Sequence, residues 1–292
     1  MTLPEFPEFK LVGLEDKKCL TEFIARYPSE ACEINFGNIF IWRHFDHSKL
    51  TTINRNLCIL CEPPLEPAYF LQPIGENKIQ ETIEACLSFA PRLSRVPESF
   101  AARHCSGLSG ELDRNNFDYI YLAEDLISLR GKKYDGKRNR IRKFEKNYHY
   151  RYLKLSQEKQ DGCRLLFENW LETKASSDGA MLSVWRHVIE EALLHFNELG
   201  LTGGIIEIDE RTAAFSIGEK LTSDTAVIHI EICDPAYEGL PQLINREFVK
   251  REWADYRFIN REQDMGSPGL RCAKTSYHPH HLVKKYNIWG RS

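Results

Sequence analysis

Three short runs in the second half of the chain decide the fold: Gly203-Gly-Ile-Ile-Glu-Ile208, Thr212-Ala-Ala-Phe-Ser-Ile-Gly-Glu219 and Thr225-Ala-Val-Ile-His-Ile-Glu-Ile-Cys233. Each run is rich in residues that favour strands, and only a few residues separate one run from the next. The separating segments carry the turn signals Asp209-Glu210 and Ser223-Asp224. Because connections this short join antiparallel neighbours, we expect a three-stranded antiparallel meander.

Helical periodicity appears on both sides of this meander. The preceding helices have apolar residues at Cys163, Phe167, Trp170 and Leu171, and then at Trp185, Val188, Ala192, Phe196 and Leu199, where Gly200 ends the second helix. After the meander we expect a helix through Leu240, Leu243, Ile244 and Phe248, a short strand from Tyr256 to Asn260, and a polar loop with Gly266 and Gly269. The apolar stripes are interpreted as core and not as cofactor-binding surfaces.

The first half of the chain has weaker patterns. It predicts a helix from Leu14 to Arg26, strands near Leu50–Ile53, Leu57–Leu60 and Tyr69–Leu71, a helix from Lys78 to Ala90, and a strand from Asp118 to Leu122. A chain of 292 residues exceeds the size at which one core usually divides. We therefore predict two α/β domains, at residues 1–134 and 156–292, with residues 135–155 forming a basic linking helix and an edge strand.

The composition is that of a globular protein, with 42% hydrophobic and 28% charged residues. The amino terminus has no apolar run, and apolar runs elsewhere are far shorter than the roughly 20 residues that span a bilayer. We therefore expect no transmembrane segment and a cytoplasmic location. The nine cysteines show no disulfide-framework spacing, which favours reduced thiols.

Two groups of residues resemble metal ligands in type. Cys58 and Cys61 have a ligand-like spacing, but no second pair completes a site, so we interpret them as buried thiols. The group His278, His280 and His281 contains a proline and has no obvious carboxylate partner, which favours a loop with exposed histidines. The sequence thus predicts no metal site.

Charge is concentrated in one segment, from Arg130 to Lys146, although the net charge of the chain is only -3. This segment has nine basic residues and two acidic ones, Asp135 and Glu145. At helical spacing Ile141, Phe144 and Tyr148 would anchor one face, so that the outward cations would be Lys137, Arg138, Arg142 and Lys143. A tRNA acceptor stem, a nucleotide-linked substrate or an acidic lipid headgroup would fit such a surface. The alternative is a solvated linker helix.

The strand at residues 225–233 carries the first candidate catalytic residues. A two-residue period places His229 and Glu231 on one face, side by side, and isoleucines on the other. A carboxylate that is partly desolvated between isoleucines is suited to act as a general base, which makes Glu231 the first candidate and His229 its neighbour. Glu219 on the preceding strand is a weaker candidate. The alternatives are a solvated polar face or a structural hydrogen bond between the pair.

Three stretches in order carry a resemblance to a known family: Lys137-Arg-Asn-Arg-Ile-Arg-Lys-Phe144, Phe215–Glu219 with His229-Ile-Glu231, and Asn260–Gly266 with Gly269–Pro279. The chain resembles the carboxy-terminal domain of phosphatidylglycerol lysyltransferase and its stand-alone bacterial relatives. This resemblance implies two tandem GNAT folds, each a mixed sheet flanked by helices, with the architecture of the Fem-type enzymes. Those enzymes move an amino acid from aminoacyl-tRNA to an amine or hydroxyl. The predicted element order of the second half is also that of a GNAT domain.

The last of these stretches brings four candidate residues within fourteen positions: Asp264, Arg271, Lys274 and Tyr277. Nearby glycines permit tight turns, and Arg271 and Lys274 would share a face if the segment were helical. The family pattern implies that Lys274 lies in the active region, where it would hold the donor or an oxyanion. Asp264, Arg271 and Tyr277 are candidates for substrate binding. A surface salt-bridge network of Asp264 and Arg271 is the alternative.

The loop after the third strand of the meander bears on the donor. In CoA-dependent GNAT enzymes a glycine-rich loop at a helix amino terminus holds the pyrophosphate, whereas here residues 235–244 contain one glycine and two prolines. No dinucleotide or Walker-type motif is present. We therefore predict an aminoacyltransferase that uses aminoacyl-tRNA and needs no further cofactor, acting on an unknown acceptor. The alternatives are a CoA-dependent N-acyltransferase that uses acetyl-CoA, and a non-catalytic module that binds RNA or phosphorylated ligands.

Overall fold

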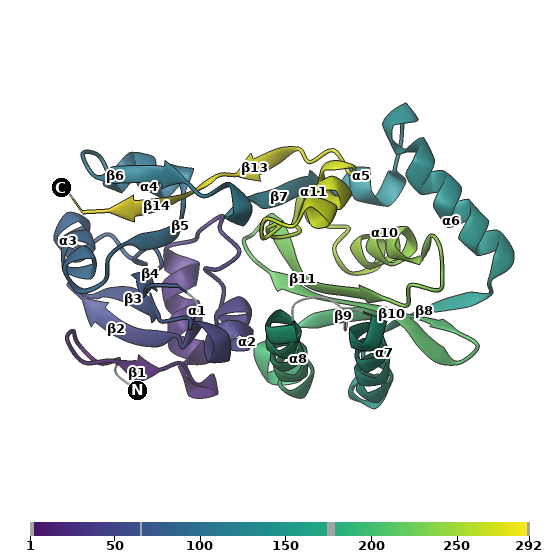
Figure 1. The fold of residues 1–292 in the computed structure, drawn as a ribbon, viewed down its shortest axis with the longest axis horizontal. Helices are drawn as coiled ribbons and strands as arrows, with labels where there is room; N and C mark the ends of the chain where they lie inside the picture. The colour runs from purple at the N-terminus through teal and green to yellow at the C-terminus, as the bar shows by residue number, and fades with distance from the viewer. Residues whose placement is uncertain (1–2, 65, 174–178, 291–292) are drawn as a thin grey trace. The chain divides into compact units, whose positions relative to one another are not determined.

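The computed structural model describes residues 3–64, 66–173 and 179–290. The chain forms two compact units, and neither is continuous in sequence (Figure 1). The first unit contains residues 1–119, 263–272 and 282–292, and the second contains residues 120–262 and 273–281. The described strands form two mixed sheets, and the predicted fold class, α/β with two sheets flanked by helices, is confirmed.

The first sheet has the strand order β1-β2-β3-β4-β5-β14-β6. Its strands are β1 (Lys10–Leu11), β2 (Lys49–Ile53), β3 (Asn56–Cys61), β4 (Tyr69–Phe70), β5 (Leu93–Pro97), β6 (Ser109–Leu112) and β14 (Lys285–Trp289). The accompanying helices are η1 (Leu14–Asp16), α1 (Lys17–Arg26), α2 (Phe36–Asp46), α3 (Ile79–Phe89), α4 (Glu98–His104) and η2 (Arg114–Asn116). The two helices predicted in the first half and its three predicted strands between Leu50 and Leu71 are therefore confirmed.

The core of the first unit forms around β3, which is buried at every position because it has a neighbouring strand on each side. Helix α3 packs on this region through Ile83 and Cys86. The Cys86 sulfur lies 3.9 Å from the Cys58 sulfur, and this contact, together with burial, raises the pKa of the Cys58 thiol. Cys61 is also buried. Both cysteines of the ligand-like pair are thus buried thiols, as predicted.

The second sheet has the strand order β13-β7-β12-β11-β10-β9-β8. Its strands are β7 (Asp118–Leu122), β8 (Tyr150–Lys154), β9 (Thr202–Ile208), β10 (Arg211–Lys220), β11 (Thr225–Cys233), β12 (Phe258–Asn260) and β13 (His281–Val283). Strands β9, β10 and β11 pair antiparallel in sequence order, which confirms the predicted meander. Strand β8 lies at the sheet edge, also as predicted.

Helices cover both faces of the meander, with α10 on one side and α7 and α8 on the other (Figure 1). The helices of this part are α5 (Ala123–Ser128), η3 (Lys132–Tyr134), α6 (Asp135–Asn147), η4 (Gln157–Lys159), α7 (Gln160–Thr173), α8 (Gly179–Leu194), α9 (Phe196–Leu199) and α10 (Leu240–Glu252). Helix α10 joins β11 to β12, which pair in parallel, as a crossover connection requires. Gly200 ends α9 in the left-handed region, with φ at 72°.

Two features differ from the sequence prediction. The predicted domain ranges, 1–134 and 156–292, do not coincide with the two units, because strand β14 pairs with β5 and β6 in the first sheet. The polar loop around Gly269 is instead the helix α11 (Pro268–Thr275).

Within the described part of the chain, no helix has the length and apolar character needed to cross a membrane.

Candidate functional site

A pocket of about 400 Å³ lies in the second unit, where β11 ends and α10 begins. Its walls come from the end of β11, the loop to α10, helix α6 and helix α7: Arg140, Trp170, Glu231, Cys233, Asp234, Pro235, Tyr237, Glu238, Gly239, Pro241 and Gln242. Of the predicted catalytic residues, Glu231 is the one in this lining. The pocket therefore defines the candidate site.

Glu231 is held at both carboxylate oxygens. Arg261 Nη2 donates a hydrogen bond to Oε1 at 3.1 Å, and Asn245 Nδ2 donates one to Oε2 at 3.1 Å. The Arg261 guanidinium also lies 5.0 Å from the ring centroid of Tyr277 and 5.8 Å from that of Tyr121. These contacts fix the Glu231 side chain, which keeps 17% of its surface exposed.

Cys233, two residues further along β11, also lines the pocket. Burial and the neighbouring Glu231 raise the pKa of its thiol well above the ordinary value. A thiol that stays protonated is a poor nucleophile. The pocket therefore does not favour a mechanism through a covalent acyl-cysteine.

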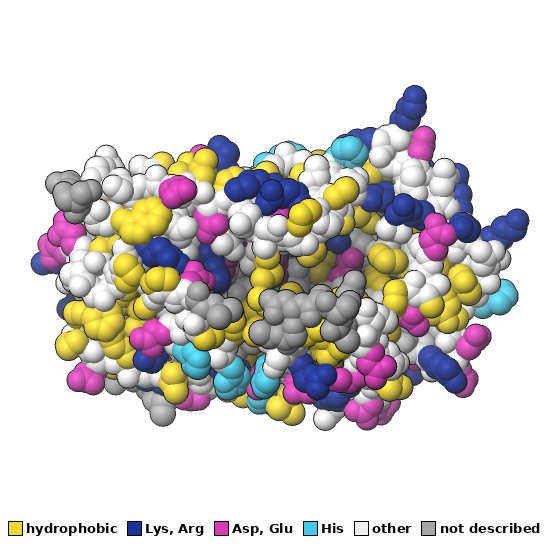
Figure 2. All heavy atoms as spheres, viewed as in Figure 1, with side chains coloured by type: hydrophobic (Ala, Val, Ile, Leu, Met, Phe, Trp, Pro, Cys, Tyr) yellow, Lys and Arg dark blue, Asp and Glu magenta, His cyan; other side chains and the backbone are white. Residues whose placement is uncertain are grey.

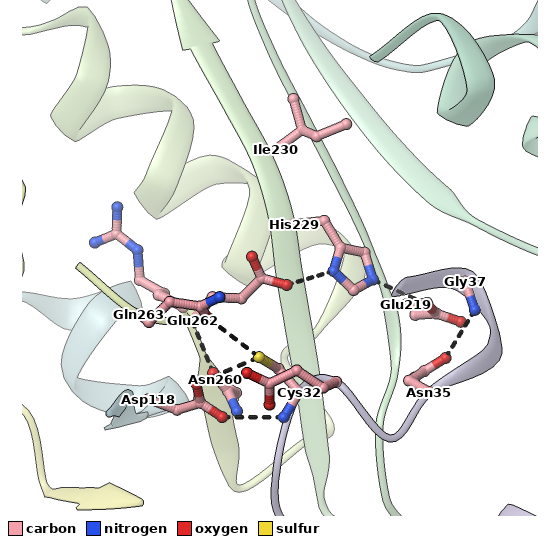
Figure 3. Close-up of polar contacts among 12 residues, drawn as sticks. Cys32, Asn35, Gly37, Asp118, Glu219, His229, Ile230, Asn260, Glu262 and Gln263 are labelled. Carbon is pink, nitrogen blue, oxygen red and sulfur yellow. Dashed lines mark hydrogen bonds and ion pairs between the residues drawn. The ribbon is translucent and has the colours of Figure 1, made fainter. Parts of the chain in front are cut away.

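His229 lies between two carboxylates, those of Glu219 and Glu262 (Figure 3). Its Nε2 is 2.9 Å from Glu219 Oε1, its Nδ1 is 2.7 Å from Glu262 Oε1, and 1% of its side chain is exposed. Burial alone would lower the pKa of His229, but the hydrogen bonds to these carboxylates outweigh it and raise the pKa to about 10. A histidine that is charged at neutral pH does not act as a general base.

A β-bulge at His229 explains why the two-residue alternation predicted for β11 does not hold there. The pairing register between β10 and β11 shifts so that Ile217 faces Ile230 while Gly218 faces Ile228, which leaves His229 as the extra residue. A bulge breaks the two-residue alternation of side chains. His229 and Glu231 therefore belong to separate hydrogen-bonded groups, and the predicted side-by-side pair does not form.

Lys274 and Tyr277 lie near the Glu231 group in the second unit. Lys274 Nζ donates a hydrogen bond to the backbone carbonyl of Arg261. Tyr277 is 5% exposed, and burial raises the pKa of its phenol. Neither residue lines the pocket described above. Lys274 and Tyr277 both contact Arg261, the first at its backbone and the second at its guanidinium. A role of either residue in the reaction or in substrate binding stays a prediction.

Asp264 and Arg271, in contrast, belong to the first unit, so the four residues of the last motif divide between the units. The fully buried Asp264 carboxylate accepts hydrogen bonds from Arg271, Arg114 and Tyr119 at 2.7 to 3.0 Å. Burial would raise the pKa of Asp264, but the bonds from Arg271 and Tyr119 lower it well below its usual range. The ion pair that we named as the alternative is present, with a buried acidic partner.

Helix α6 carries the basic segment, and Figure 2 shows Lys and Arg side chains along its exposed side. Ile141 and Phe144 are buried, as the helical spacing predicted. Lys137, predicted to point outward, instead bonds Ser276 Oγ and lies 4.1 Å from the Tyr277 ring centroid.

The other three predicted phosphate-binding residues differ among themselves. Arg138 donates to the backbone carbonyls of Leu129 and Gly131 and so holds the end of α5 in place. Arg142 is exposed, and Lys143 is exposed and pairs with Glu238. Arg142 and Lys143 are therefore accessible to a polyanion, whereas Arg138 has a structural task.

The amino terminus of α10 explains the single glycine of the preceding loop. Gly239 has φ at 94°, and a Cβ atom there would lie 2.5 Å from the backbone oxygen of Arg140. Helix α6 thus packs directly against this turn. The helix has a proline in its first turn, Pro241, which removes one of the N–H groups that could bind a phosphate.

A buried ionic cluster lies in the first unit. Lys285 Nζ is 2.6 Å from both Glu33 Oε2 and Asp118 Oδ1, and 3.7 Å from Cys32 Sγ. Among the described residues, Cys32, Glu33 and Asp118 form the one group of three that could hold a metal ion. The ammonium group of Lys285 already supplies a positive charge to both carboxylates there.

Three residues of the site were not identified from the sequence: Arg261, Asn245 and Glu262. Arg261 and Glu262 follow β12 directly, within the stretch that carries the resemblance, but charged residues in a loop give no sign of their partners. Asn245 sits within the apolar period of α10 and is fully buried. A polar residue on the buried face of a helix was the available signal.

Comparison of the sequence with known proteins gives a family match and a curated relative. The family model described as "Phosphatidylglycerol lysyltransferase, C-terminal" matches residues 24–289. A curated relative, an uncharacterized protein of Mycoplasmoides gallisepticum, is 22% identical over 184 residues, which span 61% of this chain and 57% of that protein.

Solved structures show the same fold. A conserved protein of unknown function from Bacteroides thetaiotaomicron has a TM-score of 0.88 at 28% identity, covering 97% of this chain and 99% of that one. The L-PGS structure from Bacillus licheniformis has a TM-score of 0.66 at 15% identity, covering 100% and 95%. The FemX structure has a TM-score of 0.60 at 8% identity, covering 97% and 98%.

Proposed function

This chain belongs to the family of the phosphatidylglycerol lysyltransferase C-terminal domain, and on that premise we propose that it transfers an aminoacyl group from a charged tRNA to an acceptor amine or hydroxyl. Family and fold support an acyl- or aminoacyltransferase at the coarser level. The acceptor nitrogen or oxygen would form a bond to the aminoacyl carbonyl carbon. The ester bond to the terminal ribose would break, and the acceptor proton would pass to the ribose oxygen.

The observation that carries the choice of donor is the construction of the pocket beside the α10 amino terminus. A CoA pyrophosphate needs several backbone N–H groups and open space at such a terminus. Here Pro241 removes a donor, and the backbone of α6 at Arg140 occupies the space beside Gly239. The same contact brings a basic helix to the edge of the pocket, which favours a donor with a phosphate backbone.

The charges available for tRNA lie on α6. Arg140 lines the pocket, and Arg142, Lys143 and Lys146 are exposed on the same helix. Exposed cations at this density give salt-dependent affinity for nucleic acid, because each contact with a phosphate releases counterions. We place the tRNA end at the pocket and its backbone along α6.

The experiment is equilibrium binding of bulk charged tRNA at several salt concentrations, followed by an assay for transferred amino acid. The Arg142→Ala, Lys146→Ala variant should weaken binding and reduce the slope of log affinity against log salt by about one for each cation removed. A Lys18→Ala, Lys250→Ala variant, which removes the same charge from exposed positions on α1 and α10, should bind as the wild type does.

A CoA-dependent N-acyltransferase is the second candidate, favoured by the position of the pocket at a helix amino terminus, where an anion is stabilised. Binding of acetyl-CoA together with salt-insensitive or absent tRNA binding would replace the proposal with this one. Tight tRNA binding with no transfer to any acceptor amine would leave a non-catalytic RNA-binding module.

A further inference from the structure

The Glu231 carboxylate is fixed from three separate elements of the second unit. Glu231 itself is on β11, Asn245 is on α10 and Arg261 follows β12. Each carboxylate oxygen accepts one hydrogen bond from this support, at 3.1 Å. A carboxylate oxygen has two acceptor sites, so one on each oxygen is left for another donor.

The two residues that hold Glu231 each have a buried polar atom without a hydrogen-bond partner. Arg261 Nη1 and Asn245 Oδ1 are buried and have no hydrogen-bond partner. A buried polar group without a partner costs about 1 to 3 kcal/mol, and native structures hold few of them. If the ion pair of Glu231 and Arg261 served stability alone, hydrogen-bond partners for these two atoms would make the protein more stable. Their absence therefore favours a functional reason for holding the Glu231 carboxylate in this position.

The pocket wall around Glu231 suits a positively charged ligand group. Asp234 adds a second carboxylate to the lining, whereas Glu238 is paired with Lys143, and Arg140 is the one guanidinium in the lining. Trp170 and Tyr237 add aromatic rings, whose faces attract cations. A ligand group that donates hydrogen bonds to carboxylates and lies against aromatic rings is an ammonium group.

We propose that Glu231 is the fixed counter-ion for the α-ammonium of the aminoacyl donor, with Arg261 and Asn245 as its positioning residues. The inference rests on the proposed function and names what the pocket requires of the donor: a free, charged amine next to the carbonyl to be transferred. Glu231 then works as a counter-ion held in a fixed position and not as the general base. An N-acylated aminoacyl group, which lacks this charge, is excluded.

The test is calorimetric binding of puromycin, a stable aminoacyl-nucleoside with a free α-amine, and of N-acetylpuromycin to the intact protein. The wild type should prefer puromycin by about tenfold to a hundredfold, the usual effect of a hydrogen bond to a charged group. Glu231→Gln should lose this preference. Glu210→Gln, which removes an exposed carboxylate from the turn between β9 and β10, should keep it.

Arg261 variants separate positioning from simple structural support. Arg261→Gln should reduce the ratio of the two affinities, and Arg261→Lys should restore part of that ratio. A merely structural Arg261 would lower the unfolding temperature and weaken both ligands equally, with the ratio unchanged. Thermal unfolding of each variant checks that the protein is folded when it is measured.

Two results would overturn the inference while the proposed function stands. These are equal affinity for the two nucleosides, or transfer from N-acetylaminoacyl-tRNA as fast as from aminoacyl-tRNA. If puromycin does not bind although aminoacyl transfer proceeds, the inference also fails. If neither puromycin binding nor transfer is found, the inference and the proposed function fail together.

Discussion

The pair of carboxylates around His229 predicts a strong pH dependence of stability. The pKa of the buried imidazole is raised to about 10 from 6.5. A raised pKa in the folded state contributes stability that is fully present below pH 6.5 and is lost as pH rises towards 10. A shift of this size corresponds to an upper limit of about 5 kcal/mol, at about 1.4 kcal/mol for each pKa unit.

The expected change is measurable in a moderate pH range. Between pH 6.5 and pH 8.5 the stability contribution of His229 should fall by about 2 kcal/mol. Urea unfolding of the wild type and of His229→Gln at each pH gives the difference in free energy of unfolding, and titrations common to both proteins cancel in that difference. His187→Gln, at an exposed histidine on α8, is the matched control and should show a difference that does not vary with pH.

A direct measurement accompanies the unfolding series. The ring carbon signals of His229 in a histidine-labelled sample should remain those of the charged imidazolium up to about pH 9. A wild-type-minus-variant difference that is constant from pH 6.5 to pH 8.5, or a His229 ring that titrates near 6.5, would refute the reasoning. Either result would restore His229 as a possible general base.

Three other substitutions test contacts described above. Gly239→Ala should destabilise the second unit by about 1 to 3 kcal/mol and displace α6, because the added Cβ would meet the Arg140 backbone. Gly136→Ala on α6 should be neutral or stabilising, because a Cβ there meets nothing within 4 Å. Thermal unfolding of the two variants compares these effects. Lys285→Met should cost about 3 to 5 kcal/mol in urea unfolding, because it leaves two buried carboxylates without their cation. Asp264→Asn should lower the unfolding temperature at pH 7, and the difference from the wild type should shrink as the pH falls below the ordinary value of 3.8, because the stabilisation from a carboxyl with a lowered pKa is lost as the pH falls towards that pKa.

The sequence predicted the regular elements well where the signal was local. The meander, the edge strand β8 and the strand Asp118–Leu122 follow from alternation and turn residues that lie within the segment itself. The buried face of α6 follows from the spacing of Ile141 and Phe144. Hydrophobic periodicity is sufficient for such elements, because burial on one face is all that they require.

The remaining features depend on partners that are distant in sequence. Strand β14 was missed because Lys285 and Asn287 interrupt its apolar alternation, and the ionic partners of Lys285 are 167 and 252 residues away. The extra residue at His229 depends on the register of β10 against β11, which the sequence does not display. For the same reason Arg261 gave no sign of its bond to Glu231, 30 residues earlier.

The place of β14 between β5 and β6 also bears on how the protein forms during translation. The ribosome releases β6 well before residues 285–289, so β6 must wait for β14, its neighbouring strand, until those residues have been made. The meander and its helices are complete earlier. Synthesis from the amino terminus therefore favours an order in which the meander forms first, while the sheet of the first unit depends on β14 to close it and to deliver the Lys285 cation that its buried carboxylates need.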